Sequence, residues 1–149
     1  MMSVEPGIVD TNVLAYATNA DVPNHTASCA LLDAARDPSI TLYVTSQILC
    51  EFYSVITNPR RVANPSSPAQ ASQIVSALLA SAGIRILPLP ARTATILMEL
   101  LQRHPISGAQ IFDLKIVATM KVDNVQRIYI FNAADFEVFP ELTVVVPTV

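Results

Sequence analysis

Three carboxylates interrupt stretches of sequence that are otherwise almost entirely apolar. They are Asp10 at the end of residues 7–9, Glu51 within residues 48–53, and Asp113 within residues 111–117. A buried carboxylate without a partner is costly, so each must be exposed, protonated, paired with a base or bound to a metal. Lys115 is the only basic residue inside either of the two later segments, so ion pairs could neutralise one or two acids at most. Gathered in one pocket, the three acids would supply the oxygen ligands that Mg²⁺ or Mn²⁺ prefers.

Each acid, taken singly, also has a purely structural interpretation. Asp10 or Asn12 could cap the helix that follows the first strand. Glu51 could lie on the solvated face of an amphipathic helix. Asp113 could be an acid near a helix N-terminus, favoured there by the helix dipole. Three such acids in hydrophobic surroundings are better explained by convergence on one pocket.

A further polar pair follows a later apolar stretch. Asn132 and Asp135 come directly after the strand predicted at residues 127–131. Both residue types form turns, so a plain turn is one interpretation. In a parallel sheet, however, they would lie at the same edge as Asp10.

The hydrophobic pattern predicts strands that alternate with helices along the chain. Strands are expected at residues 8–9, 40–44, 84–89, 127–131 and 143–146. Helices are expected at residues 13–17, 25–35, 46–57, 68–82, 90–104 and 109–121, with Ser67 as an N-cap and Gly83 at the C′ position. This alternation predicts an α/β fold with a parallel sheet covered on both faces, in a single domain over residues 1–149.

Composition excludes several classes of protein. Hydrophobic residues make up 52% of the chain, charged residues 14%, and the net charge is −3, which excludes a disordered chain and a generally basic nucleic-acid binder. No apolar run reaches the roughly 18 residues of a membrane span, and the start lacks a signal-peptide pattern, so we expect no membrane and a cytoplasmic protein. Cys29 and Cys50 are expected to be reduced core residues, and with His25 and His104 they make a poor zinc set. Three glycines cannot make a Gly-rich phosphate loop.

These motifs together resemble a known family. Asp10-Thr11-Asn12 follows an apolar strand, Glu51 lies in a helix capped by Thr45 or Ser46, and Asp113 lies in a Gly-x-x-x-x-Asp helix. The closing motif is Asn132-x-x-Asp135-Phe136, followed by Phe139-Pro140. In order and spacing they resemble a PIN domain, most of all the VapC-type toxin ribonucleases of bacterial and archaeal toxin–antitoxin pairs. The resemblance covers essentially the whole chain.

The resemblance implies a three-layer α/β/α sandwich with a mostly parallel sheet of about five strands. It also implies a metal-dependent endoribonuclease in which the acids matching Asp10, Glu51 and Asp113, with one more from the last motif, surround one or two Mg²⁺ ions. A VapB-like antitoxin would cover that site, and the likeness together with the apolar composition favours a homodimer. The chain departs from the family at Ile130, where a Thr or Ser is usual, and at Asn132, where Asp is common. The fourth ligand therefore lies between Asn132 and Asp135.

The hypothesis that follows is metal-assisted hydrolysis of RNA phosphodiester bonds. Asp10 and Asp113 would bind Mg²⁺ directly, Glu51 would bind it through water or orient the attacking water, and Asp135 would complete the catalytic set. Thr11 and Asn12 would position a carboxylate or a phosphate oxygen. Arg60 and Arg61, adjacent in a Pro-flanked loop, are the leading candidates for contacts with the RNA backbone. Repulsion among the acids is expected to raise at least one pKa and to let Mg²⁺ stabilise the fold.

Other functions remain open at this point. A haloacid-dehalogenase-type phosphatase would need a second Asp where Asn12 stands. A response-regulator receiver would need an acidic pair near the start and a Lys directly after a late strand, and residues 130–132 offer no Lys. A catalytically silent PIN-like module that binds a partner is a further alternative, and metal binding distinguishes it. A PIN nuclease of RNA processing would use the same chemistry as a toxin.

Overall fold

Five short parallel strands form the centre of the computed structural model, which describes residues 4–149. The strands are β1 (Gly7–Val9), β2 (Leu42–Val44), β3 (Ile84–Ile86), β4 (Arg127–Tyr129) and β5 (Thr143–Val145). Their order across the sheet is β3-β2-β1-β4-β5, and every neighbouring pair runs parallel. The predicted parallel sheet is therefore confirmed, with β1 at its centre.

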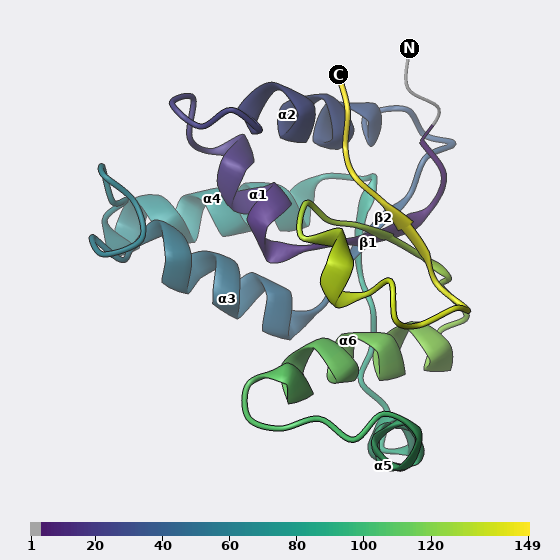
Figure 1. The fold of residues 1–149 in the computed structure, drawn as a ribbon. Coiled ribbons are helices and arrows are strands. Elements are labelled where there is room, and N and C mark those ends of the chain that lie inside the picture. Colours follow the sequence, from purple (N-terminus) through teal and green to yellow (C-terminus); the bar gives the residue numbers. More distant parts are fainter. Residues whose placement is uncertain (1–3) are drawn as a thin grey trace.

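Helices flank this sheet and make the outer layers of the sandwich. They are α1 (Thr11–Ala17), α2 (His25–Ala34), α3 (Ser46–Ile56), α4 (Pro68–Ala80), α5 (Arg92–Arg103), α6 (Gln110–Val122) and the short 3₁₀ helix η1 (Ala133–Asp135). Figure 1 shows α5 and α6 on one side of the sheet and α1 and α2 on the other. Helix α1 contacts α2 and α3, α3 also contacts α4, and α5 packs on α6. Within residues 4–149, no helix is long and apolar enough to cross a bilayer.

The core lies where the central strands meet both helical layers. Ile8, Leu42 and Val44 are fully buried, as are Leu114 and Val117 on α6. A central parallel strand is covered on both faces, which explains why the sequences of β1 and β2 are almost entirely apolar. The strands are shorter than the hydrophobic runs that predicted them. The strand predicted at residues 84–89 ends at Ile86, and the one predicted at residues 127–131 ends at Tyr129.

The end of α4 differs from the prediction. The helix stops at Ala80, and Ser81 leaves it in an extended conformation with φ −72° and ψ 125°. Gly83 has no left-handed φ, so its prediction as a C′ residue was wrong. Gly83 is needed for space instead, because a Cβ atom there would stand 1.9 Å from the carbonyl oxygen of Ala35.

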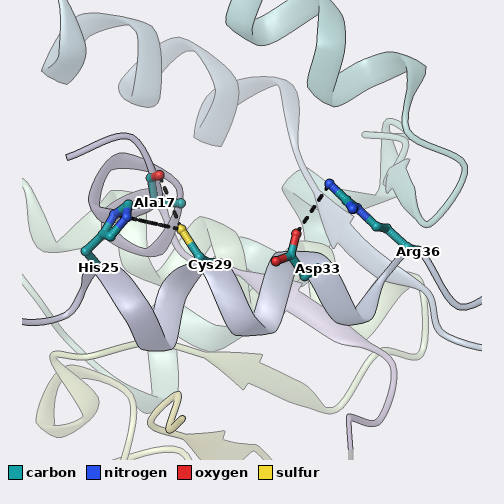
Figure 2. A network of polar contacts seen from close by, with 5 residues as sticks. All are labelled: Ala17, His25, Cys29, Asp33 and Arg36. Carbon is teal, nitrogen blue, oxygen red and sulfur yellow. Dashed lines mark hydrogen bonds and ion pairs between the residues drawn. The ribbon is translucent and has the colours of Figure 1, made fainter. Parts of the chain in front are cut away.

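The two cysteines lie on different helices. Cys29, half-buried on α2, has its Sγ 3.6 Å from Nε2 of His25 and 3.5 Å from the carbonyl oxygen of Ala17 (Figure 2). His25 in turn has Nδ1 2.8 Å from the carbonyl oxygen of Tyr16. Cys50 is exposed on α3, so its prediction as a core residue was wrong. Helix α3 is amphipathic, and Cys50 lies on its outer, exposed face.

Candidate active site

The four acids singled out in the sequence come from four different elements. Asp10 follows β1, Glu51 lies on α3, Asp113 lies in the first turn of α6, and Asp135 ends η1. The charges of Glu51 and Asp135 act on Asp10, and those of Asp135, Asp10 and Glu51 act on Asp113. The fold therefore brings together carboxylates that stand up to 125 positions apart in the chain (135 minus 10).

Asp10 is fixed by its own backbone and by the start of α1. Its N–H donates to the carbonyl oxygen of Tyr129 at 3.0 Å, which extends the β1–β4 ladder by one bond. Its Oδ2 accepts a hydrogen bond from the backbone N–H of Asn12 at 3.1 Å, so Asp10 is the N-cap of α1. Asp10 can therefore cap α1 and still belong to the group of acids, because Oδ2 accepts the capping hydrogen bond and Oδ1 takes no part in it.

Two neighbours hold Glu51. The hydroxyl of Thr11 donates to Oε2 at 3.0 Å, and the side-chain amide of Gln47 donates to Oε1 at 2.9 Å. Thr11 is 7% exposed, which limits the directions its hydroxyl can take. Gln47 escaped the sequence analysis, although its spacing of four residues from Glu51 on one helix is the pattern that places two side chains together.

Burial sets the protonation of two of the acids. It raises the pKa of the Asp10 carboxyl, hydrogen bonds from backbone groups of Asn12 and Thr11 oppose that shift, and the charges of Glu51 and Asp135 add to it. Burial also raises the pKa of Asp113, and the charge of Asp135 is the next largest cause. The expected rise is present, but desolvation outweighs the repulsion that the sequence analysis invoked.

Basic side chains do not neutralise this group. The ion pairs found within residues 4–149 are Arg36–Asp33 (Figure 2) and Lys121–Glu141. Both lie on other parts of the molecule. Asp10, Glu51 and Asp113 therefore rely on hydrogen bonds and on solvent.

The four acids line two pockets, two in each. The first, here called the Arg61 pocket, has a volume of about 300 Å³ and is lined by Asp10, Thr11, Asn12, Glu51, Ser54, Val55 and Arg61. The second, here called the α6–η1 pocket, has a volume of about 610 Å³ and contains Asp113 and Asp135. Each pocket thus holds one pair of the acids.

Two predicted residues lie apart from these pockets. Asn132 is exposed at the start of η1, and its side chain makes no capping hydrogen bond to that helix within the described chain. Asp135, in contrast, lines the α6–η1 pocket beside Asp113. Arg60 is exposed in the turn after α3, whereas its neighbour Arg61 lines the pocket that holds Asp10.

The donor set suits a hard divalent cation. Carboxylate oxygens line both pockets, and the His25–Cys29 pair lies elsewhere, on α2. Among residues 4–149, no three His, Cys, Asp or Glu side chains are gathered closely enough to enclose an ion by themselves. Mg²⁺ commonly keeps several of its waters and binds through one or two carboxylates, so separated acids around an open site fit its needs.

Known proteins resemble this chain in both sequence and fold. Residues 7–141 match the family model described as PIN domain. Ribonuclease VapC43 of Mycobacterium tuberculosis is 40% identical over 81 residues, which cover 54% of this chain and 55% of that protein, so the match spans about half of the relative's length. The crystal structure of M. tuberculosis VapC20, titled a Sarcin-Ricin loop cleaving toxin, has a TM-score of 0.65 at 21% identity, covering 89% of this chain and 94% of its own. VapBC2 from Rickettsia felis, bound to a promoter DNA fragment, has a TM-score of 0.69 at 17% identity, covering 96% and 99%.

Proposed function

The chain belongs to the PIN domain family, and on this premise we propose that it is a metal-dependent endoribonuclease that hydrolyses RNA phosphodiester bonds. The observation that carries the proposal is the placement of Asp10, Glu51, Asp113 and Asp135 in two open pockets, with no ion pair to any of the four acids within residues 4–149. A fold without a ligand to bind there would gain nothing from such a group, because like charges in a partly buried site are destabilising.

Asp10 and Asp113 are the proposed direct ligands of the metal. Both are partly desolvated and both feel the other acids, so a divalent cation between them would relieve the repulsion. Asp135 is the proposed fourth acid because it shares a pocket with Asp113. Asn132 lines neither pocket, so it is not proposed as a direct ligand.

Glu51 is proposed to orient the attacking water. Thr11 and Gln47 fix one oxygen each, which leaves lone pairs on both oxygens for a water molecule. A divalent metal bound at this site would lower the pKa of a bound water and stabilise charge on the scissile phosphate. Mg²⁺ is the proposed ion, and Mn²⁺ is the expected substitute.

Arg61 is proposed to hold the RNA backbone next to the acids. It is the cation of the Arg61 pocket, and its planar guanidinium can donate two parallel hydrogen bonds to a phosphate. Thr11 and Asn12 line the same pocket and hold the two carboxylates through the bonds described above. Arg60 is proposed as an outer contact that adds charge without reaching the site.

A toxin role and a protein partner complete the proposal. The named relatives are VapC ribonucleases, and the neighbouring structures include toxin–antitoxin complexes. We therefore propose a VapB-like antitoxin that covers the acids, and a homodimer as the working form. Expression in a bacterial host with and without the co-expressed antitoxin tests this role, since growth arrest should occur only without it.

The nuclease activity is tested by cleavage of a mixed structured-RNA substrate with Mg²⁺ or Mn²⁺. Wild type is compared with Asp10→Asn and Asp113→Asn, which keep the side-chain size and remove the charge. Loss of one charged ligand should lower the cleavage rate by about 10²–10³-fold, since the metal supplies several kcal/mol of transition-state stabilisation. Absence of cleavage together with absence of metal binding in calorimetry would instead support a silent module that binds a partner.

A further inference from the structure

The two pockets that hold the acids differ in their other lining residues. The Arg61 pocket offers a guanidinium, hydroxyls and an amide, which suit a phosphate and a ribose. The α6–η1 pocket is about twice as large, and six of its nine lining residues are apolar, the other three being Gln110, Asp113 and Asp135. In a nuclease, the Arg61 pocket would suit the RNA backbone, which leaves the α6–η1 pocket for another part of the RNA.

The wall of the α6–η1 pocket is apolar and partly rigid. Leu114 is fully buried and Phe139 is 5% exposed, so both are held by the core. Val138 is 62% exposed and belongs to the same pocket, so its side chain is open to solvent. The open apolar surface of the pocket is therefore that of Val138 and of the exposed Ala109 and Ala134, and covering it with a flat, uncharged group would be favourable.

A phosphate suits the Arg61 pocket better than the α6–η1 pocket. Each pocket holds two acids, but Arg61 lines the first and no basic side chain is among the nine residues that line the second. Gln110, exposed in the first turn of α6, adds a neutral amide that can both donate and accept. Apolar faces with a polar edge are the chemistry of a nucleobase, which single-stranded RNA presents unstacked.

We propose that the α6–η1 pocket binds a nucleobase of the substrate RNA, next to the scissile phosphate. The proposal rests on the proposed nuclease function and adds the part of the RNA that each pocket takes. The amide oxygen of Gln110 accepts hydrogen bonds, and the exocyclic amino groups of adenine, cytosine and guanine donate them, whereas uracil has only its ring N3–H to donate. We therefore expect the pocket to prefer a base with an exocyclic amino group over uracil.

The proposal is tested first without cleavage. The ¹⁵N-labelled protein is titrated with adenosine, cytidine, guanosine and uridine, which are uncharged and need no metal. Backbone amide signals of Ala109, Gln110 and Val138 should shift at millimolar nucleoside, and more for an amino-bearing base than for uridine. No shift at these positions with any nucleoside would overturn the proposal, whether or not the protein cuts RNA.

Variants test whether the shifts arise in the pocket itself. Val138→Trp fills it from an exposed position, and Gln110→Ala removes its neutral amide, so the first should abolish the shifts and the second should reduce them. Leu79→Trp is the matched control, because Leu79 is 45% exposed on α4 and lines neither pocket. Shifts that persist in Val138→Trp would contradict the assignment.

Cleavage of a random-sequence RNA pool then separates the two proposals. Sequencing of the cut ends should show one position beside the break where uracil is depleted, and Val138→Trp should remove that bias. If Val138→Trp cuts RNA with the same depletion of uracil, the nuclease function is supported and the proposed base pocket is overturned. Nucleoside shifts without any cutting would support the pocket and count against the nuclease function.

Discussion

The hydroxyl of Thr11 donates a hydrogen bond to Oε2 of Glu51 at 3.0 Å, joining two residues 40 positions apart in the sequence. Thr11 begins the helix that Asp10 caps, so a single turn of α1 holds one acid by its backbone and another by a side chain. The relative placement of Asp10 and Glu51 is therefore set by one short segment.

Removal of the Thr11 hydroxyl should impair the chemistry more than the fold. Thr11→Val keeps the shape but leaves Glu51 with a single partner, Gln47. Loss of such a supporting hydrogen bond typically lowers metal affinity or activity about 10–100-fold. Thr11→Ser retains the donor and should keep most of the activity. Loss in Thr11→Ser with activity retained in Thr11→Val, measured as kcat/KM on one RNA, would show that the methyl group matters and the hydroxyl does not.

The metal-free protein should become less stable as the pH rises above the ordinary carboxyl range. Because burial raises the pKa of Asp10 in the folded state, the folded chain binds a proton more tightly than the unfolded chain. The stabilising contribution is fully present below the ordinary pKa of 3.8 and is lost as the pH rises through the raised value. Urea unfolding with a chelator, from below that pH to neutral, should show this decline, and Asp10→Asn should reduce it.

An exposed acid supplies the control for this pH experiment. Hydrogen bonds from the backbone N–H and the hydroxyl of Ser39 lower the pKa of Asp37. Its contribution has the opposite sign, since it is present above the ordinary pKa and lost as the pH falls through the lowered value. Asp37→Asn should therefore leave the wild-type decline towards neutral pH in place. A decline removed by Asp37→Asn and kept in Asp10→Asn would contradict the assignment to the site.

Added Mg²⁺ should raise the thermal midpoint of the wild type. An ion that binds only the folded chain stabilises it by about 2.7 kcal/mol when its concentration is a hundred times Kd. Asp10→Asn and Asp113→Asn should show a smaller rise, because each lacks one proposed ligand. Scanning calorimetry at increasing Mg²⁺ measures the effect, with NaCl at equal ionic strength as the reference. Identical midpoints for wild type with Mg²⁺ and with NaCl would argue against the metal site.

Arg61 and Arg60 form a matched pair for testing the RNA contact. Arg61 lines the pocket of Asp10, whereas Arg60 is exposed outside it. In an Asp113→Asn background that keeps the RNA intact, Arg61→Ala should weaken binding and lower the slope of log K against log salt by about 0.7. Arg60→Ala should have a smaller effect. Filter binding over a range of salt concentrations provides the measurement, and a larger loss in Arg60→Ala would reverse the roles.

A methyl group at Gly83 should be poorly tolerated. It would overlap the carbonyl oxygen of Ala35, and backbone cannot move aside as a side chain can. Overpacking of this kind typically costs about 1–3 kcal/mol, and urea unfolding of Gly83→Ala measures it. Ser81→Ala, two residues earlier, should be nearly neutral. A Gly83→Ala protein as stable as wild type would mean that the α2 end shifts freely.

The alternation of elements was readable from the sequence because apolar periodicity and breakers agree along the whole chain. Ser67-Pro68 marks the start of α4 correctly, with a full capping box to Gln70. The role of Gly83 was not readable, because it depends on Ala35, which is distant in the chain and meets it only in the fold. Cys50 was misplaced because apolar neighbours on both sides of a position do not say which helix face it occupies.

The candidate acids stood out in the sequence because charge within an apolar stretch is conspicuous. The residues that hold them were harder to find, since Gln47 is an ordinary helix residue until Glu51 is known to lie one turn away. Asp135 lines a pocket with Asp113 and Asn132 does not, a difference that the sequence of a three-residue helix does not reveal. Local pattern therefore identifies the charged groups, and tertiary contacts identify what orients them.

The position of Arg61 has an evolutionary consequence. The acids stand on strand ends and helices that the core fixes, whereas Arg61 belongs to the segment between α3 and α4, whose residues 57–67 are half-buried or exposed. Surface substitutions in such a segment typically change stability by no more than about 0.5 kcal/mol. If Arg61 holds the RNA backbone as proposed, substitutions in that segment can change the affinity for RNA while the acids on the core elements stay unchanged.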